Sequence, residues 1–425
     1  GSGLFHIRQP ALVGRPEAQA TMETAAQAVL DGRGPRVLFI EGEAGVGKSY
    51  LASWLRERLE ENGHMRSLVI RSEPQSEAGG GLRQAILRFI GAPTADEEES
   101  ANVFAAAFPD ADVQAAAMEV LWGDAPRLGV ASDRHLKLAA EVLNHVIADR
   151  PFLLWADDAQ WSPEGNILRL IHRLARPDGP SNLLILATVR PSERSTVRAA
   201  RRELLKLPSA ELIELNPVNP FELAPALEAL APLPPGLAEA ACMMAAGNPL
   251  IALEAVRSFL EDEGLGHAPS DPNTVLRKRI DYATSGERGG ELRSALARAT
   301  LLGRSFKLKP LAKLCEVSGD ENAPQLTGEH DMVEGLIEQA VNSGLAVEQG
   351  PRRWRFSHDL IRAQLRKDCR ELSNWPDLNR AAAGLRLGRA DSDPSGIELE
   401  VVARHFWEAG DKLRALRMGL DGLNR

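Results

Sequence analysis

The sequence predicts an α/β domain, with a parallel sheet covered by helices on both faces, followed by smaller domains that are mainly helical. Three observations lead to this fold class. Short apolar runs alternate with amphipathic stretches through the first half of the chain. Two prolines, Pro217 and Pro220, then interrupt the pattern. After them no apolar run of strand character occurs for many residues, and helical periodicity dominates.

Five apolar runs are expected to form the strands of the sheet. They cover residues 36–40, 67–70, 152–155, 183–189 and 212–215. Between them, residues 136–148 and 167–175 have the apolar spacing of helices. Strands that alternate with helices run parallel and are buried on both faces, so we expect a parallel sheet.

The length of 425 residues exceeds what one compact core accommodates. We expect four segments: residues 1–216 with the sheet, a helical lid at 217–272, a winged-helix domain at 273–372, and a helical arm at 373–425. The winged-helix prediction depends on helices followed by a hairpin around Gly350. The arm is similar to the start of a TPR-like array, and one such repeat cannot bury its own apolar face.

Composition and charge exclude few functions. The net charge of −9 argues weakly against a nucleic-acid-binding surface over the whole chain, although a local basic patch stays possible. Cys242, Cys315 and Cys369 are far apart and follow no metal-binding or disulfide spacing. No run reaches the roughly 18 apolar residues of a membrane span, and no signal-peptide pattern opens the chain. We therefore expect a cytoplasmic protein with reduced thiols and no membrane partner.

A glycine-rich loop lies between the first expected strand and a helix. Its residues are Gly42, Glu43, Ala44, Gly45, Val46, Gly47, Lys48 and Ser49. The glycines let successive backbone N–H groups face inward, and the following helix adds partial positive charge, so the loop can hold phosphates. Lys48 is expected to reach the β- and γ-phosphates and Ser49 to bind Mg²⁺. The sequence thus predicts a P-loop NTPase core, and Tyr50 is counted among its nucleotide-binding residues.

Two carboxylates follow the third apolar run. Burying Asp157 and Asp158 at a strand end is costly unless they have partners, and Mg²⁺ beside the phosphates would supply one. We assign Asp157 to the metal through water and Asp158 to polarising the attacking water, with Glu164 as the alternative base. The next apolar run ends at Arg190, whose cation is expected to face the γ-phosphate.

These motifs resemble the STAND class of AAA+-related ATPases, the signal-transduction ATPases with numerous domains, over nearly the whole chain. Residues 12–17 match the entry motif of that family. The resemblance implies that Val13, Gly14 and Arg15 contact adenine and phosphate. Residues 157–158 are similar to its double-acid Walker B motif and residues 188–190 to its arginine sensor.

Two further motifs match the same family outside the expected sheet domain. Pro249 lies in a turn like the one whose proline packs on adenine in the family. His358 lies in a segment similar to the winged-helix motif whose histidine touches the β-phosphate of ADP. The alternative interpretations are a helix-breaking turn and an ordinary packed histidine.

The resemblance implies a switch that is closed with ADP and that opens with ATP to self-associate as a homo-oligomer, with slow ATP hydrolysis. The modules most similar to it belong to large LuxR-type regulators and to bacterial signalling kinases and cyclases. An activator, protein or small molecule, would bind the C-terminal helical region, and the effector would lie elsewhere in the full-length chain. A DNA-binding AAA+ ATPase is the main alternative, because the wing holds Arg352, Arg353 and Arg355. A scaffold that binds nucleotide only for stability is another.

Overall fold

The computed structural model describes residues 11–72, 80–92, 103–121, 132–148, 150–162, 165–191, 195–230, 233–261, 272–286, 288–320, 324, 331–350, 352–388 and 396–423. The chain divides into two compact units. The first, Arg15–Asn216, is called the sheet unit here. The second, Pro217–Arg425 together with the residues that precede Arg15, is called the helical unit.

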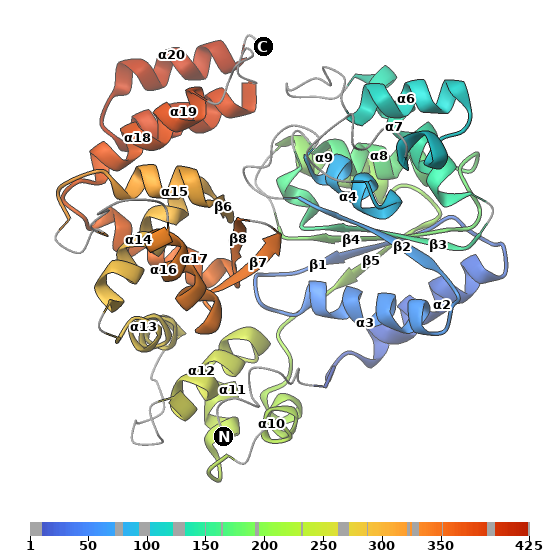
Figure 1. Ribbon diagram of the computed structural model, residues 1–425. Helices are drawn as coiled ribbons and strands as arrows, with labels where there is room; N and C mark the ends of the chain where they lie inside the picture. Colours follow the sequence, from blue (N-terminus) through green and yellow to red (C-terminus); the bar gives the residue numbers. More distant parts are fainter. Residues whose placement is uncertain are drawn as a thin grey trace. The chain divides into compact units, whose positions relative to one another are not determined.

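The sheet unit contains the five predicted strands, all parallel (Figure 1). They are β1 (Arg36–Glu41), β2 (Arg66–Arg71), β3 (Phe152–Asp157), β4 (Leu183–Val189) and β5 (Ala210–Glu214), in the order β2-β3-β4-β1-β5. Every residue of β3 and β4 is buried, as expected for central strands of a parallel sheet. The predicted α/β fold class is confirmed. Strand β4 lies between β1 and β3, so the ends of these three strands are neighbours.

Helices cover both faces of this sheet. They are α2 (Pro16–Leu30), α3 (Lys48–Glu61), α4 (Gly80–Ile90), α6 (Ala111–Leu121), α7 (Asp133–Ile147), α8 (Asn166–Leu174) and α9 (Ser195–Leu204). Because strand side chains alternate, Val37 and Phe39 face the large core shared with α4, α6, α7, α8 and α9. Helices α2 and α3 lie on the other face (Figure 1). The loops that follow the carboxyl ends of the strands therefore lie between two layers of helices.

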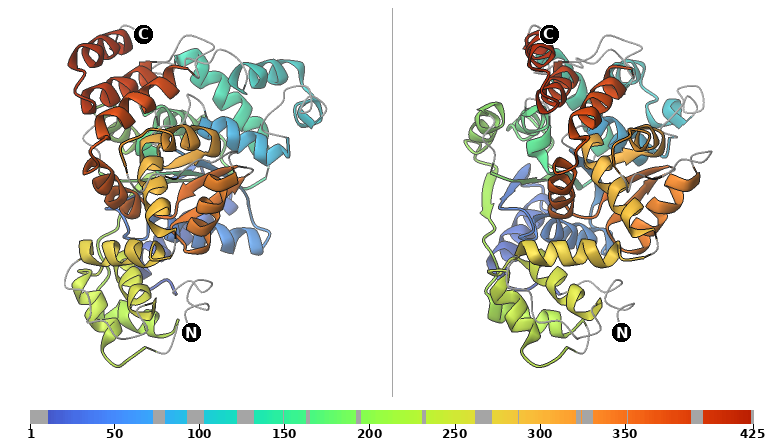
Figure 2. Two further views of the ribbon diagram at one scale, coloured as in Figure 1. Left: turned by 60° about the vertical axis from the view of Figure 1, so that its left-hand side comes forward. Right: turned by 90° about the vertical axis from the view of Figure 1, so that its left-hand side faces the viewer.

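The helical unit contains three groups of helices. The first is α10 (Pro220–Glu228), α11 (Leu237–Met244) and α12 (Pro249–Glu261), which share an apolar core. The second is α13 (Pro272–Ala283), α14 (Gly289–Leu302), α15 (Leu308–Cys315), α16 (Asp331–Asn342) and α17 (Asp359–Arg370). The third is α18 (Trp375–Leu387), α19 (Gly396–Glu408) and α20 (Lys412–Leu423). In the views of Figure 2, α18, α19 and α20 lie side by side in red.

The second group of helices carries a small antiparallel sheet. It consists of β6 (Ser305–Lys307), β7 (Ala346–Gly350) and β8 (Arg353–Phe356), in the order β6-β8-β7. The predicted hairpin is present as β7 and β8. Strand β6 was not predicted, because three residues with one buried side chain, Phe306, are too few to show a period of two. We call α13–α17 with this sheet the hairpin domain.

Several sequence expectations concern single side chains. All three cysteines, Cys242, Cys315 and Cys369, are free and buried.

No helix among the described residues combines the length and the apolar character needed to cross a bilayer. In α20, Leu413 is 83% exposed, so this helix presents apolar surface to solvent.

Candidate nucleotide-binding site

The glycine-rich loop connects β1 to α3, which begins at Lys48. Gly45 and Gly47 have φ angles of +84° and +99°, in the left-handed region that side chains with a Cβ rarely adopt. At Gly42, a Cβ atom would lie 2.6 Å from the carbonyl oxygen of Leu215. The loop therefore needs glycine at these three positions, and its backbone forms the start of a helix at which an anion is stabilised.

Lys48 is buried at the base of this loop, with 6% of its surface exposed. Its Nζ donates hydrogen bonds of 2.7 Å to the carbonyl oxygens of Gly42 and Glu43. Burial and the charge of Arg190 together lower the pKa of Lys48 to about 8, although nearby carboxylates act in the opposite direction. The pKa of Lys48 thus depends on the charged groups at the ends of β3 and β4. These groups and Lys48 therefore belong to one site.

Ser49 and Asp157, distant in sequence, meet at this site. The Ser49 hydroxyl donates to Asp157 Oδ1 at 2.8 Å. The buried hydroxyl of Thr188 donates to the same oxygen at 2.7 Å. Since β4 lies between β1 and β3, Thr188 near the end of β4 is placed to hold this carboxylate toward the loop. The two residues predicted to bind Mg²⁺ are therefore in direct contact.

Asp158 lies in a separate part of the same network and is 4% exposed. Its backbone is in the left-handed region, with φ of 54°, and its N–H donates to Thr188 Oγ1 at 2.9 Å. Its Oδ1 accepts a hydrogen bond of 3.0 Å from Gln160 Nε2 and lies 3.5 Å from Arg190 Nε. The backbone N–H of Arg190 donates to Gln160 Oε1 at 3.0 Å. Gln160 therefore connects the predicted base to the predicted γ-phosphate sensor.

Gln160 was not among the predicted site residues. It lies in the short 3₁₀ helix η1 (Ala159–Trp161) directly after β3 and is buried. A glutamine has no charge to reveal its function in a sequence, although its position two residues after the acidic pair is a usable signal. The alternative base, Glu164, lies outside the described residues.

The oxygen atoms at this site suit Mg²⁺. A hydroxyl and a carboxylate are hard ligands, which Mg²⁺ prefers, and phosphate oxygens and water commonly complete its octahedral shell. Among the described residues, no group of three or more histidine, cysteine or acidic side chains could hold a metal by itself. Ser49 and Asp157 therefore fit a nucleotide-associated Mg²⁺ rather than a metal site formed by protein side chains alone.

Arg15 is the part of the entry motif that belongs to the sheet unit. Its guanidinium donates to the carbonyl oxygen of Val46 at 3.1 Å and to that of Asn216, so it lies against the loop. Val13 and Gly14 belong to the helical unit, where a Cβ at Gly14 would lie 2.6 Å from Val218 Cγ1.

Tyr50 follows the loop in α3 and is half-buried. Burial raises the pKa of its phenol, as does the charge of Glu57.

Pro249 and His358 both lie in the helical unit. Pro249 is the first residue of α12, where the Asn248 side chain accepts hydrogen bonds from the N–H groups of Leu250 and Ile251 at 3.2 and 3.3 Å. Asn248 thus caps the helix and Pro249 occupies a position that favours proline. His358 immediately precedes α17, and its side chain is 36% exposed.

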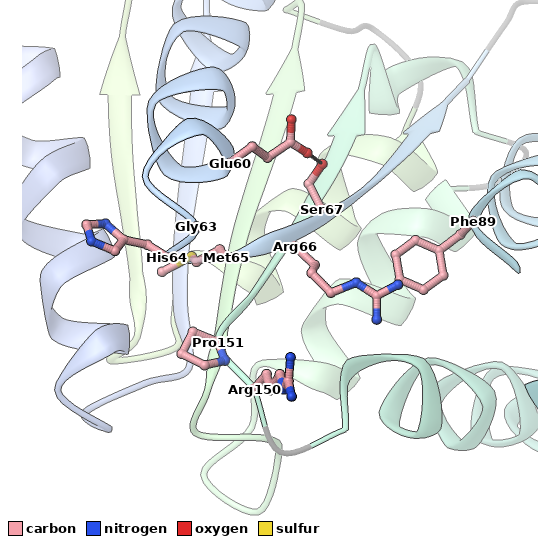
Figure 3. A pocket seen from close by; sticks show the side chains of 9 residues that line it. All are labelled: Glu60, Gly63, His64, Met65, Arg66, Ser67, Phe89, Arg150 and Pro151. Atoms are coloured by element: carbon pink, nitrogen blue, oxygen red, sulfur yellow. Dashed lines mark hydrogen bonds between the residues drawn. The ribbon is translucent and has the colours of Figure 1, made fainter.

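A cavity of about 520 Å³ in the sheet unit lies away from these residues (Figure 3). It is lined by residues at the start of β2 and just before β3, including Arg66 and Pro151. Arg66 lies over the ring of Phe89, 4.5 Å from its centroid. The cavity lies at the amino ends of the strands, whereas the glycine-rich loop follows the carboxyl end of β1. In a parallel sheet these are opposite ends, so the cavity and the loop are far apart. The cavity contains none of the predicted site residues.

Replacing Lys48 with alanine is expected to weaken nucleotide binding by about 10- to 150-fold, since charge-assisted hydrogen bonds contribute roughly 1.5–3 kcal/mol. Titration calorimetry with ATP and ADP measures the effect. Lys206→Ala, which removes an exposed lysine on the surface of the sheet unit, is the matched control. An unchanged affinity in Lys48→Ala would place the phosphates elsewhere.

Comparison with known proteins agrees with this geometry. Residues 11–186 match the family model of the AAA ATPase domain. No curated protein matches the chain by sequence. Solved structures that resemble it include a STAND protein with a tetratricopeptide repeat sensor from Pyrococcus horikoshii, at 12% identity and a TM-score of 0.48. That match covers 91% of this chain and 47% of the other, so the chain spans about half the length of that protein.

Two other solved structures are similar at lower TM-scores. One is the ORC1 protein of Aeropyrum pernix in complex with DNA, at 15% identity and a TM-score of 0.41, with 86% of this chain and 96% of that chain covered. The other is RuvB of Thermotoga maritima, at 14% identity and a TM-score of 0.34, with 83% and 94% covered. At these identities and scores, none of the three carries an argument about function.

The family match and the geometry of the site agree with each other. The matched residues contain the loop, the acidic pair and most of β4, and the site joins them through hydrogen bonds. Over residues 11–186 the chain is similar to the AAA ATPase domain, and the described fold of this part is that of a P-loop NTPase, consistent with the resemblance that its motifs carry.

Proposed function

We propose that the protein is a signalling switch that binds ATP and ADP and hydrolyses ATP slowly. One observation carries the proposal: the predicted base Asp158 and the predicted sensor Arg190 are an ion pair, and Gln160 bonds to both. A γ-phosphate attracts the Arg190 cation and so competes with Asp158 for it. The presence of the γ-phosphate thereby determines whether Asp158, the residue that activates water, is paired with Arg190.

The roles of the single residues follow from their chemistry. Lys48 and the loop N–H groups bind the phosphates, and Arg190 stabilises the charge that develops on the γ-phosphate. Asp158 accepts a hydrogen bond from the attacking water and polarises it. Ser49, and Asp157 through water, would hold Mg²⁺, which would neutralise phosphate charge. Thr188 orients Asp157, so that only one of the two aspartates is available as the base.

The helical unit supplies the conformational part of the proposal. We assign residues 217–272 to a lid, 273–372 to a winged-helix domain and 373–425 to a TPR-like arm. Pro249 packs on adenine and His358 binds the β-phosphate of ADP, which favours a closed monomer. ATP favours an open state that self-associates, and each nucleotide shifts the equilibrium only by its differential affinity for the two states. An activator binding to the arm and an effector in another part of the full-length protein would complete the pathway.

The experiment that tests this function identifies the nucleotide that copurifies with the protein, together with its mass in solution. The protein is denatured, the supernatant is separated by ion exchange, and light scattering gives the mass. We expect about one ADP per chain on a monomer, and exchange into a non-hydrolysable ATP analogue should raise the mass. A monomer with either nucleotide would contradict the switch.

A second candidate function is favoured by the basic hairpin. Arg352, in the turn between β7 and β8, has φ of +54° and is exposed, and Arg353 and Arg355 follow in β8. A wing of this charge suits the phosphates of duplex DNA. A gel shift at moderate salt, together with the ATPase rate with and without DNA, separates the two functions. Strong DNA stimulation of an otherwise empty, monomeric protein would favour a DNA-binding AAA+ ATPase.

A further inference from the structure

Glu254 is a buried carboxylate around which three basic side chains gather. It lies in α12 and is 1% exposed. Arg257, in the same helix, is 2.8 Å from its Oε1, and Arg279 of α13 is 3.5 Å from its Oε2. The Nε2 atom of His358 is 3.8 Å from Oε1. This carboxylate is therefore an ion pair with Arg279 of the hairpin domain, and His358 of the same domain lies near it, beyond hydrogen-bond distance.

This arrangement fixes the carboxylate firmly. Arg279 is itself 1% exposed, and its Nη2 donates to the carbonyl oxygen of Ser343. A Cβ at Gly344, where φ is +73°, would lie 3.1 Å from the same Nη2 atom. A buried charge is tolerated only with a partner, so Arg279 and Glu254 hold each other in place. His358, in contrast, keeps part of its ring accessible.

The charges around His358 favour an anionic ligand. Burial is the largest influence and lowers the pKa of its imidazole; Glu254 raises the pKa, while Arg257 of α12, Arg355 of β8 and the neighbouring Arg304 lower it. One carboxylate is thus outnumbered by three cations around the ring. A phosphate group would offset this excess and make the protonated imidazole, with two N–H donors, more favourable.

We infer that Glu254 is the positioning residue of His358: its negative charge, 3.8 Å from Nε2, orients the ring so that Nδ1 is presented to the phosphate of a bound nucleotide. This inference rests on the proposed function, in which His358 binds the β-phosphate of ADP. With an anion on each side, the protonated imidazole is favoured, and its Nδ1–H donates to the phosphate. A carboxylate behind an imidazole fixes the ring orientation and its protonation in the same way at many other sites.

The inference also gives α12 a double role. The helix begins at Pro249, the residue assigned to adenine, and Glu254 lies five positions later in it. A single rigid helix therefore carries the adenine contact and the residue that holds the phosphate contact. Adenine binding and phosphate binding are coupled through it without any contact between Pro249 and His358.

The test is ADP binding by titration calorimetry between pH 6 and 8, in buffers of different ionisation enthalpy, which count the protons taken up. For the wild-type protein we expect net proton uptake on binding. Glu254→Gln is expected to lower ADP affinity about tenfold, the equivalent of one pKa unit at His358, and to reduce the proton uptake. His358→Ala under the same buffers corrects for the ionisation of the nucleotide itself.

Two further variants keep the test independent of folding. Glu254→Asp retains the charge paired with Arg279 but moves it back by one methylene, and it is expected to lose less affinity than Glu254→Gln. In the double variant Glu254→Gln with His358→Ala, affinity should be no lower than in His358→Ala alone, because both changes remove one interaction. Hydrogen exchange of α12 and α17 without nucleotide shows whether each variant retains its structure.

The possible failures are distinguishable. If His358→Ala leaves ADP affinity unchanged, the proposed role of His358 is wrong. If His358→Ala weakens ADP but Glu254→Gln leaves affinity and proton uptake unchanged, the proposed function stands and the inference about Glu254 fails. A higher ADP affinity in Glu254→Gln would make the carboxylate a competitor of the phosphate, which also overturns the inference.

Discussion

Replacing Asp158 with asparagine is expected to lower the rate of ATP hydrolysis by about 10²- to 10⁴-fold, the usual contribution of a positioned acid or base. The amide keeps the shape of the side chain, and its oxygen can still accept the hydrogen bond from Gln160 Nε2. It cannot take a proton from water, so chemistry is lost while binding is retained. Phosphate release under single-turnover conditions measures the rate, and calorimetry with ATP measures the affinity.

The neighbouring carboxylate provides the control for this variant. Asp157 accepts hydrogen bonds from Ser49 and Thr188 and faces the proposed metal position. Asp157→Asn is therefore expected to weaken Mg²⁺-dependent ATP binding, with excess Mg²⁺ restoring part of the activity. If Asp158→Asn hydrolyses ATP at the wild-type rate and Glu164→Gln does not, Glu164 is the base and Asp158 a structural residue.

The strands and the loop chemistry could be predicted because they depend on local sequence. Apolar runs bounded by polar residues predict buried strands. The spacing of the glycines predicts the phosphate-binding loop, because the backbone of such a loop needs glycine at those positions. The order of the strands could not be predicted, since pairing in a parallel sheet joins segments far apart in the chain. Only that order places Thr188 beside Asp157 and Arg190 beside Asp158.

The buried polar residues of the helical unit were missed for a related reason. Arg279 lies in a helix with ordinary charged neighbours, and arginine is rarely fully buried, so nothing in the sequence marks it as a core residue. Its burial depends on Glu254, which is 25 positions earlier in a different helix. His405 is similar, because its partner Asn379 lies in another helix, and nothing in the sequence relates the two.

Among the described residues, His405 is one at which pH is expected to have a large effect on stability. It lies in α19, is 3% exposed, and its Nδ1 is 2.9 Å from Asn379 Oδ1 in α18. Burial, the largest influence, and the charges of Arg386, Arg366 and Arg404 together lower the pKa of the imidazole to about 3. The folded chain therefore strongly favours the neutral ring.

Linkage gives the sign of the resulting pH dependence. The unfolded chain protonates His405 near its ordinary pKa of about 6.5, well before the folded chain does. The stability associated with the neutral ring is thus fully present above about pH 6.5 and is lost as pH falls toward 3. The loss is at most about 1.4 kcal/mol per pH unit and builds up gradually near pH 6.5, so lowering the pH from 6.5 to 4.5 is expected to cost about 2 kcal/mol.

His405→Gln is the variant that isolates this effect, because glutamine can donate to Asn379 Oδ1 but does not titrate in this range. Hydrogen exchange of peptides from α18 and α19 at pH 7 and pH 5, corrected for the intrinsic exchange rates, measures the local free energy of opening. Compared with the wild type, the variant should lose much less stability on acidification, whereas His64→Gln, which replaces an exposed histidine in the sheet unit, should behave like the wild type. If His405→Gln and the wild type lose equal stability between pH 7 and 5, then other groups, or water reaching the ring, determine the acid response of this helix pair.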